Sequence, residues 1–348
     1  MREIKFHKDF KLNGNSFSNE NDILSYAKEN EDLATYNFLC NWFSKSATLP
    51  VNTSGSTGVP KIIFLEKEFM INSAKTTGDY FKLKENTSAL LCLPTQYIAG
   101  KMMLVRALTL GWHIDTVLSS LNPLEDIEKS YDFLAMVPLQ LENSLLKINK
   151  FKKIIIGGGV VSSQLEDKLQ NYKAAIFATY GMTETITHIA VKLLNRKKFA
   201  SNFFKILPNI NIYKDQRNCL VIEAPLLSRD LIITNDVVDL ISDTEFNWLG
   251  RFDNVINSGG VKLHPEIIEK KLSNSIESRY FITSVKDEKL GEKLVLLIEG
   301  EKKEIDFNKT ELSKFEVPKN VYFIQKFEET ETGKIQRKKS LTKIFNNK

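Results

Sequence analysis

The sequence has few cysteines, no long hydrophobic run and no strong excess of one charge. Its three cysteines, Cys40, Cys92 and Cys219, are too few for a disulfide framework in 348 residues, which favours a reducing, cytoplasmic compartment. No apolar run approaches the ~20 residues of a membrane span, and the polar start does not resemble a secretion signal. The 48 Lys and Arg residues against 43 Asp and Glu residues leave a net charge of +5, too weak at this length to indicate nucleic-acid binding.

Several common catalytic motifs are also missing. The four histidines lie far apart in the sequence without an HExxH pattern, so a zinc site is unsupported. No GxSxG element is present, which removes the local signal of a serine hydrolase. A Walker A loop would need Gly directly before Lys61, where Pro60 stands, and Ser162 occupies the third glycine position of a dinucleotide fingerprint.

What is present indicates a globular α/β protein of two domains. Hydrophobic residues make up 42% and charged residues 26% of the chain. Apolar runs alternate with helical patterns, which predicts a mainly parallel sheet. The expected strands are 89–93, 114–118, 133–137, 153–156 and 174–178, and the expected helices are 101–110, 138–148 and 162–171. Residues 1–30 are polar and Asn-rich and are expected to form a peripheral start.

The pattern changes after Thr185. Short strands at 189–194, 210–213, 220–223, 231–234 and 237–241 follow one another without helices, which predicts an antiparallel or barrel-like subdomain. A boundary is expected near residues 249–254, followed by a smaller α+β unit. We therefore predict a large domain over residues 1–251 and a small one over 252–348, the latter with helices at 265–273 and 336–345 and strands at 281–286 and 293–299.

A loop suited to phosphate lies near the start of the chain. Glycines allow close backbone approach, hydroxyls donate hydrogen bonds and a lysine adds positive charge. These residues are Thr53, Ser54, Gly55, Ser56, Thr57, Gly58 and Lys61. The alternative is a flexible Ser/Gly linker, but the ordered apolar residues after Pro60-Lys61 disfavour it.

Three further motifs follow in the chain. Residues 179–185 come after an expected buried strand and offer an aromatic ring, hydroxyls and one carboxylate that could hold Mg²⁺. Residues 250–262 and 332–337 each combine glycine with basic residues. The alternative for the first of these is an ordinary strand end with a solvated Glu.

In this order and spacing, the motifs resemble the adenylate-forming superfamily of acyl- and aryl-CoA ligases, peptide-synthetase adenylation domains and luciferases. The resemblance extends from residue 53 to residue 337. It implies a nucleotide site formed by the phosphate loop and by Gly157, Gly158, Gly159, Tyr180, Gly181, Asp236 and Arg251. It also implies that Lys334, Thr183 and Glu184 act in adenylation, with Glu184 holding Mg²⁺. A turn residue at Asp236 and a solvated lysine at 334 are the plainer alternatives.

The same resemblance implies ATP, Mg²⁺ and coenzyme A as reaction partners, and a small C-terminal domain that rotates between two half-reactions. Asp253 falls at the family's hinge position, and Ser258, Gly259 and Gly260 would line the path of the pantetheine arm. The chain departs from the family in its short N-terminal region before residue 53 and in Asn235, where glycine is usual before the aspartate. Homo-oligomerisation is left open.

Within the superfamily, residues 93–108, 137–141 and 154–159 look most like a short o-succinylbenzoate–CoA ligase of menaquinone biosynthesis. Its substrate has two carboxylates, one activated and one recognised. Arg106 is the candidate for that recognition, with Tyr97 at the position of an aromatic or His gate. A surface arginine is the alternative for Arg106. Other aryl or acyl acids, a carrier-protein acceptor and a non-catalytic nucleotide-binding relative remain alternatives for the whole chain.

Overall fold

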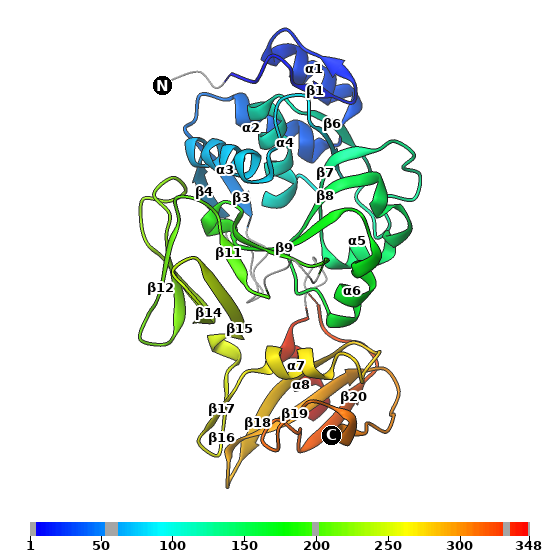
Figure 1. The fold of residues 1–348 in the computed structure, drawn as a ribbon, viewed down its shortest axis with the longest axis vertical. Coiled ribbons are helices and arrows are strands. Elements are labelled where there is room, and N and C mark those ends of the chain that lie inside the picture. The colour runs from blue at the N-terminus through cyan, green and yellow to red at the C-terminus, as the bar shows by residue number, and fades with distance from the viewer. Residues whose placement is uncertain (1–4, 53–61, 197–201, 330–334, 347–348) are drawn as a thin grey trace.

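The strands and helices of the chain form two bodies that meet just after Arg251 (Figure 1). The computed structural model describes residues 5–52, 62–196, 202–329 and 335–346. The large sheet of the first body contains β1 (Lys11–Leu12), β2 (Asn15–Ser16), β5 (Ser88–Leu91), β6 (His113–Thr116), β7 (Tyr131–Met136), β8 (Phe151–Ile156), β9 (Ala175–Gly181), β10 (His188–Leu193), β11 (Phe204–Ile206), β12 (Asn211–Lys214), β13 (Cys219–Glu223), β14 (Ile232–Leu240) and β15 (Glu245–Arg251).

The other elements of the first body lie around this sheet. Its helices are α1 (Glu20–Asn30), α2 (Leu33–Phe43), α3 (Lys67–Phe81), α4 (Ile98–Leu110), α5 (Pro138–Asn143) and α6 (Ser163–Lys168). Three 3₁₀ turns are η1 (Leu145–Lys150), η2 (Leu169–Asn171) and η3 (Thr183–Thr185), and a separate ribbon pairs β3 (Thr48–Asn52) with β4 (Ile62–Glu66). The helices expected at 138–148 and 162–171 each break into a short α-helix followed by a 3₁₀ turn.

The expected parallel sheet is confirmed at the centre of the first body. Strands β6, β5, β7, β8 and β9 are parallel neighbours. The C-terminal parts of β5, β7 and β8 are continuously apolar, and Leu90, Leu134 and Ile154 are fully buried. Such continuous apolar runs are typical of strands covered on both faces. The loops after these strands therefore share one edge of the sheet, where ligands bind in open α/β folds.

The antiparallel strands expected after Thr185 continue this same sheet. β10 pairs with β9, and the order runs on through β11, β15, β14 and β13 to β12 at the end. The strands expected at 231–234 and 237–241 form one strand, β14, and β15 was not anticipated. These strands curl around a packed cluster of Tyr180, Phe204 and Phe246. The strand order stays open in the part of the chain that the structure describes, so the subdomain is a curved extension of the sheet without a closed barrel.

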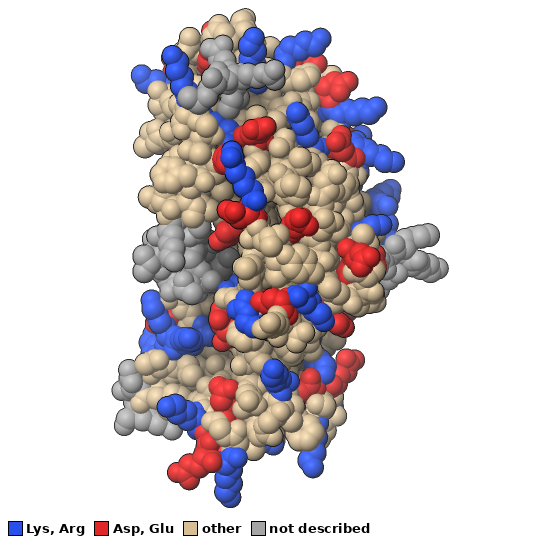
Figure 2. Space-filling model, turned by 90° about the vertical axis from the view of Figure 1, so that its left-hand side faces the viewer, with Lys and Arg blue, Asp and Glu red and all other residues tan. Residues whose placement is uncertain are grey.

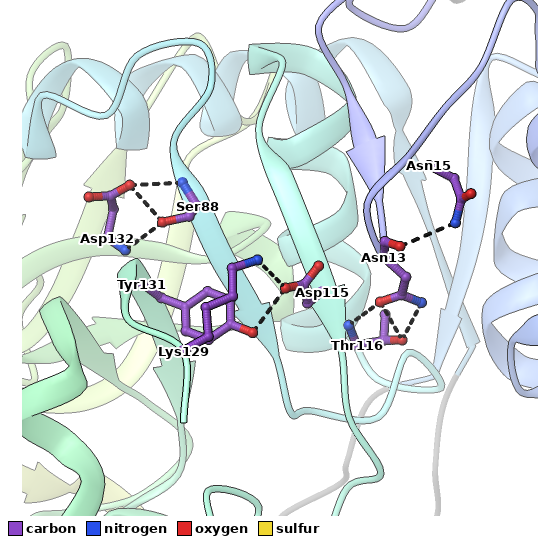
Figure 3. A network of polar contacts seen from close by, with 8 residues as sticks. All are labelled: Asn13, Asn15, Ser88, Asp115, Thr116, Lys129, Tyr131 and Asp132. Carbon is purple, nitrogen blue, oxygen red and sulfur yellow. Dashed lines mark hydrogen bonds and ion pairs between the residues drawn. The ribbon is translucent and has the colours of Figure 1, made fainter. Parts of the chain in front are cut away.

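The prediction of a peripheral N-terminal start was wrong. β1 adds to the large sheet parallel to β6, and Phe10 and Leu12 are fully buried. The Asn13 side chain exchanges hydrogen bonds with Thr116, donating from Nδ2 to Oγ1 at 3.0 Å and accepting from the backbone N–H at 2.8 Å (Figure 3). Its amide also reaches Glu31 at 2.7 Å. Polar side chains here satisfy backbone groups at a sheet edge, which composition alone does not distinguish from a solvated tail.

The second body begins after a 3₁₀ turn, η4 (Phe252–Asn254). Its elements are β16 (Ile256–Ser258), β17 (Val261–Leu263), α7 (Pro265–Leu272), β18 (Tyr280–Asp287), β19 (Gly291–Glu299), η5 (Phe307–Lys309), β20 (Asn320–Ile324) and α8 (Arg337–Asn346). The expected helices and strands are confirmed, whereas the β16–β17 hairpin and β20, which pairs parallel to β19, were not anticipated. The apolar residues of this body form their own clusters. A domain boundary between residues 251 and 252 remains a prediction, as does the mobility of the second body.

The surface carries mixed charge. On the face shown in Figure 2, basic and acidic side chains are interspersed over both bodies. This distribution agrees with the small net charge of +5. Among the described helices, none combines the length and the apolar character needed to cross a membrane.

The burial of the N-terminal strand leads to a stability prediction. Leu12→Ala should lower the free energy of unfolding by about 2–5 kcal/mol, the usual range for removing a fully buried leucine side chain. Lys8→Ala, at an exposed position in the same segment, is the matched control. Urea unfolding followed by circular dichroism measures both variants, and equal stability of the two would show that β1 is dispensable.

Candidate nucleotide and acid site

A buried carboxylate organises the curved part of the sheet. Asp236 on β14 accepts a hydrogen bond from the Tyr180 hydroxyl at 2.7 Å and another from Trp248 Nε1 at 3.1 Å. Arg251 lies 3.8 Å from the same carboxylate. Burial, followed by the nearby Asp236 charge, raises the pKa of Tyr180, so its hydroxyl stays a donor. Three residues expected in a nucleotide site are thus in contact, and Trp248 joins them.

The geometry shows what this cluster offers a ligand. Asp236 is 6% exposed and Tyr180 is 9% exposed, while Arg251 is more accessible. A carboxylate fixed by two donors can still accept hydrogen bonds from ribose hydroxyls, because it has about four lone-pair sites. Trp248 was missed by sequence reasoning. Its position two residues before Gly250 in the same strand is the signal that could have found it.

The glycine loop after β8 lies beside the end of β9. β8 and β9 pair through Ile156 and Ala178, and Thr179 Oγ1 donates to the Ile156 carbonyl at 3.0 Å. Gly158 has a φ of +80°, a conformation that favours glycine. A Cβ at Gly157 would lie 2.9 Å from Thr179 Oγ1. Small residues thus keep backbone accessible next to Tyr180.

The segment after β9 turns sharply. Tyr180 and Gly181 belong to the strand itself, and the following turn is η3, which holds Thr183 and Glu184. Glu184 is exposed and Thr183 is half-buried at this strand end. Mg²⁺ commonly takes one or two protein carboxylates and completes its shell with phosphate oxygens and water, so a single accessible Glu fits that ion. Among the described residues, no group of three or more His, Cys, Asp or Glu side chains could hold a metal.

Strain follows directly after Glu184. Ile186 has φ 65° and ψ −60°, and the Thr187 N–H donates to the Thr185 carbonyl at 2.7 Å. This is a γ-turn of the rare, strained kind, and a β-branched residue is unfavourable in it. Such strain persists only where the surroundings enforce it and is frequent at functional sites.

Arg106 is buried in α4 without a carboxylate partner in the described part of the chain. The residue is 2% exposed, and its Nη2 donates to the Thr187 hydroxyl at 3.2 Å. Its Nε has no hydrogen-bond partner there. Burial lowers the pKa of Arg106 to about 10, which leaves it charged at neutral pH. The alternative of a surface arginine is therefore wrong.

His188 adjoins this guanidinium. Its Nδ1 lies 3.2 Å from the Thr187 hydroxyl, which is also 3.4 Å from Ser73 Oγ. Burial first and the Arg106 charge second lower the pKa of His188 to about 3, so the ring stays neutral. The result is a buried cluster with one positive charge and hydroxyl groups, and no carboxylate of the described residues pairs with it. Thr187, His188 and Ser73 were not singled out from the sequence as ligands.

Tyr97 lies at the N-terminus of α4, nine residues before Arg106. At 1.5 Å per residue, about 13 Å of helix axis separates the two positions, so they are not parts of one contact. Lys101 Nζ caps the carbonyls of Thr95 and Gln96, each at 2.7 Å, and fixes the loop that carries Tyr97. Burial lowers the pKa of Lys101 to about 8. A groove of about 480 Å³ borders this loop, and its lining includes Gln96, Lys101 and Asn52.

The expected hinge and CoA-path residues lie beyond Arg251. Asp253 is exposed in η4, 3.5 Å from Arg251, and accepts from Asn235 Nδ2 at 3.3 Å. Ser258 ends β16, and Gly259 and Gly260 form a two-residue hairpin turn with φ of +58° and +83°. The hairpin alone explains both glycines, because such turns require positive φ. Residues 53–61 and Lys334 lie outside the described residues.

Comparisons of the sequence with known proteins identify its relatives. A model of the AMP-binding enzyme family matches residues 49–217. The 2-succinylbenzoate–CoA ligase of Haemophilus influenzae is 25% identical over 309 residues, covering 81% of this chain and 64% of the relative. The ligase of the same name from Lactococcus lactis is 24% identical over 313 residues, covering 83% and 69%. The chain therefore spans less than two thirds of the Haemophilus relative.

Solved structures share the fold. An o-succinylbenzoate coenzyme A synthetase from Bacillus subtilis, in complex with ATP and magnesium, has a TM-score of 0.74 at 20% identity, covering 84% of this chain and 69% of that one. An acyl-CoA synthetase (AMP-forming)/AMP-acid ligase II-like protein from Dyadobacter fermentans is 35% identical, with a TM-score of 0.60, covering 89% and 93%. Because the chain is 35% identical to this relative and covers 93% of it, and because the family model matches residues 49–217, this chain belongs to the AMP-binding enzyme family.

Proposed function

We propose that this protein is an ATP-dependent acid–CoA ligase, with o-succinylbenzoate as its acid and menaquinone biosynthesis as its context. The observation that carries the ligase proposal is the contact of Tyr180, Asp236 and Arg251, which come from separate motifs and meet beside the parallel-strand edge. A nucleotide would bind there. The ribose hydroxyls would donate to Asp236, adenine would lie between Tyr180 and the backbone of Gly157–Gly159, and Arg251 would face ribose or phosphate.

The reaction has two steps. A carboxylate oxygen of the acid attacks the α-phosphorus of ATP, pyrophosphate leaves, and an acyl-adenylate forms. The thiol of CoA then attacks the acyl carbon, AMP leaves with the bond electrons, and the thiol proton passes to solvent. Glu184 would hold Mg²⁺, which neutralises phosphate charge. Lys334 would stabilise charge at the attacked phosphate, Thr183 would contact the α-phosphate, and the residues Thr53–Lys61 would wrap the outer phosphates.

The choice of acid depends on Arg106. A buried guanidinium without a counter-charge is costly, and an anionic group that reaches it would supply the missing pair. A second carboxylate on the substrate would meet Arg106 and Thr187, and its attraction would come from the Arg106 charge because His188 stays neutral. Tyr97, at the N-terminal end of α4, would lie nearer the carboxylate that reacts. This arrangement favours a dicarboxylate with a spacer over a simple monocarboxylate.

The second half-reaction would use the second body. Asp253 would serve as the hinge, and Ser258, Gly259 and Gly260 would line the path of the pantetheine arm after rotation. The exposed position of Asp253 in a short turn between the two sheets supports this assignment. A possible homo-oligomer and a cytoplasmic location complete the proposal.

The direct test is a panel of carboxylic acids assayed for ATP-dependent pyrophosphate release, with and without CoA. We expect o-succinylbenzoate to give the highest kcat/KM, with Mg²⁺ required and a CoA thioester as the product. If another acid gave the highest rate of pyrophosphate release, the proposed ligase activity would stand and the proposed substrate would be wrong. If no acid gave pyrophosphate release while ATP still bound, the result would favour a non-catalytic nucleotide-binding relative.

Replacing Arg106 tests the acid. Arg106→Met should raise KM for a dicarboxylate about ten- to a hundredfold, because a charge-assisted hydrogen-bonded pair contributes ~1.5–3 kcal/mol. A monocarboxylate analogue that lacks the distal group serves as the internal control, and its KM should change little. Unchanged discrimination between the two acids would contradict the role of Arg106, even if total activity fell.

Replacing Lys334 tests the division of labour between the half-reactions. Lys334→Ala should slow adenylate formation by ~10²–10³ or more, the usual loss for one preorganised donor at a transition state. Thioester formation from pre-made acyl-adenylate should fall far less. Lys338→Ala, at an exposed position on α8, is the matched control. Equal losses in both half-reactions would show that Lys334 is not specific to adenylation.

A further inference from the structure

Glu266 connects three parts of the chain at the junction of the two bodies. It is the second residue of α7, and its side chain is 9% exposed. It lies against the end of β15, against the linking turn η4 and against the start of α8. The reaction described above assigns it no role.

One carboxylate oxygen of Glu266 holds the linker. Asn254 Nδ2 donates to Oε1 at 2.6 Å, and the Arg337 guanidinium lies 3.7 Å from the same oxygen. The first contact is a short charge-assisted bond, the stronger class of protein hydrogen bond. Because Asn254 ends η4, this bond fixes the direction in which the chain leaves the first body.

The other oxygen faces β15. Glu266 Oε2 is buried and has no hydrogen-bond partner among the described residues. A Cβ built on Gly250 would lie 2.2 Å from it, so only glycine lets the carboxylate approach the strand this closely. Gly250 also has a φ of +137°, which L residues rarely adopt. The next residue is Arg251, which contacts Asp236.

The contact with Arg337 extends the link to the C-terminal segment. Arg337 pairs with both oxygens of Glu269, at 2.7 and 2.9 Å, and donates to the Ile282 carbonyl at 2.9 Å. These bonds anchor the first residue of α8 on α7 and β18. Arg337 comes three residues after Lys334 in the sequence. Anchoring Arg337 therefore fixes the point at which the chain after Lys334 enters α8.

We propose that Glu266 is a positioning residue that couples the linker and the root of α8 to the strand carrying Arg251. It does not contact the reacting atoms. It holds two donors, the Asn254 amide and the Arg337 guanidinium, in one arrangement relative to Gly250. A carboxylate suits this task because its negative charge attracts both the Asn254 amide and the Arg337 guanidinium to the same oxygen, whereas an amide at this position would be neutral. The effect of Glu266 on the rate of adenylate formation rests on the proposed ligase function, because Glu266 would act through the position of Lys334.

The unsatisfied Oε2 makes the arrangement easy to release. A buried carboxylate oxygen without a donor is unfavourable, which offsets part of the gain from the Asn254 bond. Movement of α7 away from β15 would return that oxygen to water. Glu266 therefore defines one orientation of the second body without locking it.

The test is a double-mutant cycle on Glu266 and Asn254. Glu266→Ala and Asn254→Ala should each lower kcat for pyrophosphate release about tenfold, with KM for ATP and acid within about twofold. The double variant should be no worse than either single one, because both remove the same bond. Glu266→Gln keeps an acceptor for Asn254 and should recover part of the loss. Lys270→Gln, exposed on the same helix, should behave as wild type.

A second readout does not depend on activity. Hydrogen exchange of the peptide covering residues 250–257 should accelerate in both alanine variants and stay unchanged in Lys270→Gln. Additive losses, a KM change as large as the kcat change, or unaltered exchange would each overturn the coupling. If wild type makes no adenylate with any acid, the proposed function fails, and the exchange data together with non-additive unfolding free energies still decide the role of Glu266.

Discussion

The hydrogen bond from Tyr180 to Asp236 is the constraint on which the nucleotide site depends. β9 and β14 lie four places apart in the sheet, so in a flat sheet they would be about 19 Å apart at ~4.8 Å per strand. The bond is 2.7 Å long. The intervening strands must therefore curl tightly, and the aromatic rings of Phe204 and Phe246 fill the inside of that curve. The Asp236 carboxylate, which would accept hydrogen bonds from ribose hydroxyls, thus also takes part in the bond that spans the curved part of the sheet.

A second constraint is the charge of Arg106. No described carboxylate pairs with this guanidinium, so its burial opposes folding, and the protein limits this cost through Thr187 and by keeping His188 neutral. The proposed binding of a carboxylate would make this arrangement more favourable. In the proposed function, affinity for an acid and the unfavourable burial of Arg106 would thus have the same physical origin.

The sequence predicts this fold and site unevenly, for physical reasons. The parallel strands were found because strands buried on both faces are continuously apolar, and Tyr180, Asp236 and Arg251 were found because motif order points to them. β15 and the pairing of β1 were missed, since their register depends on distant partners. Trp248 and Glu266 were missed because their roles arise from contacts between segments. The burial of Arg106 follows from the packing of α4 against its neighbours. The helical pattern of the sequence alone could not decide between a surface arginine and one in a binding pocket.

The turn at residues 181–188 joins the two constraints. Gly181 packs so closely on the Thr187 carbonyl that a Cβ would lie 2.1 Å from it. The Thr185 hydroxyl accepts from the Met182 N–H at 2.9 Å and donates to the Thr187 carbonyl at 2.6 Å, which holds Ile186 in its strained turn. Such strain amounts to about 1–3 kcal/mol and needs this support. One short segment therefore positions both Glu184, which we propose faces the nucleotide, and Thr187, which we propose faces the acid. A change that relaxed the turn would move the proposed metal ligand and the proposed carboxylate partner together, so a single piece of backbone would align the two substrates of the proposed reaction.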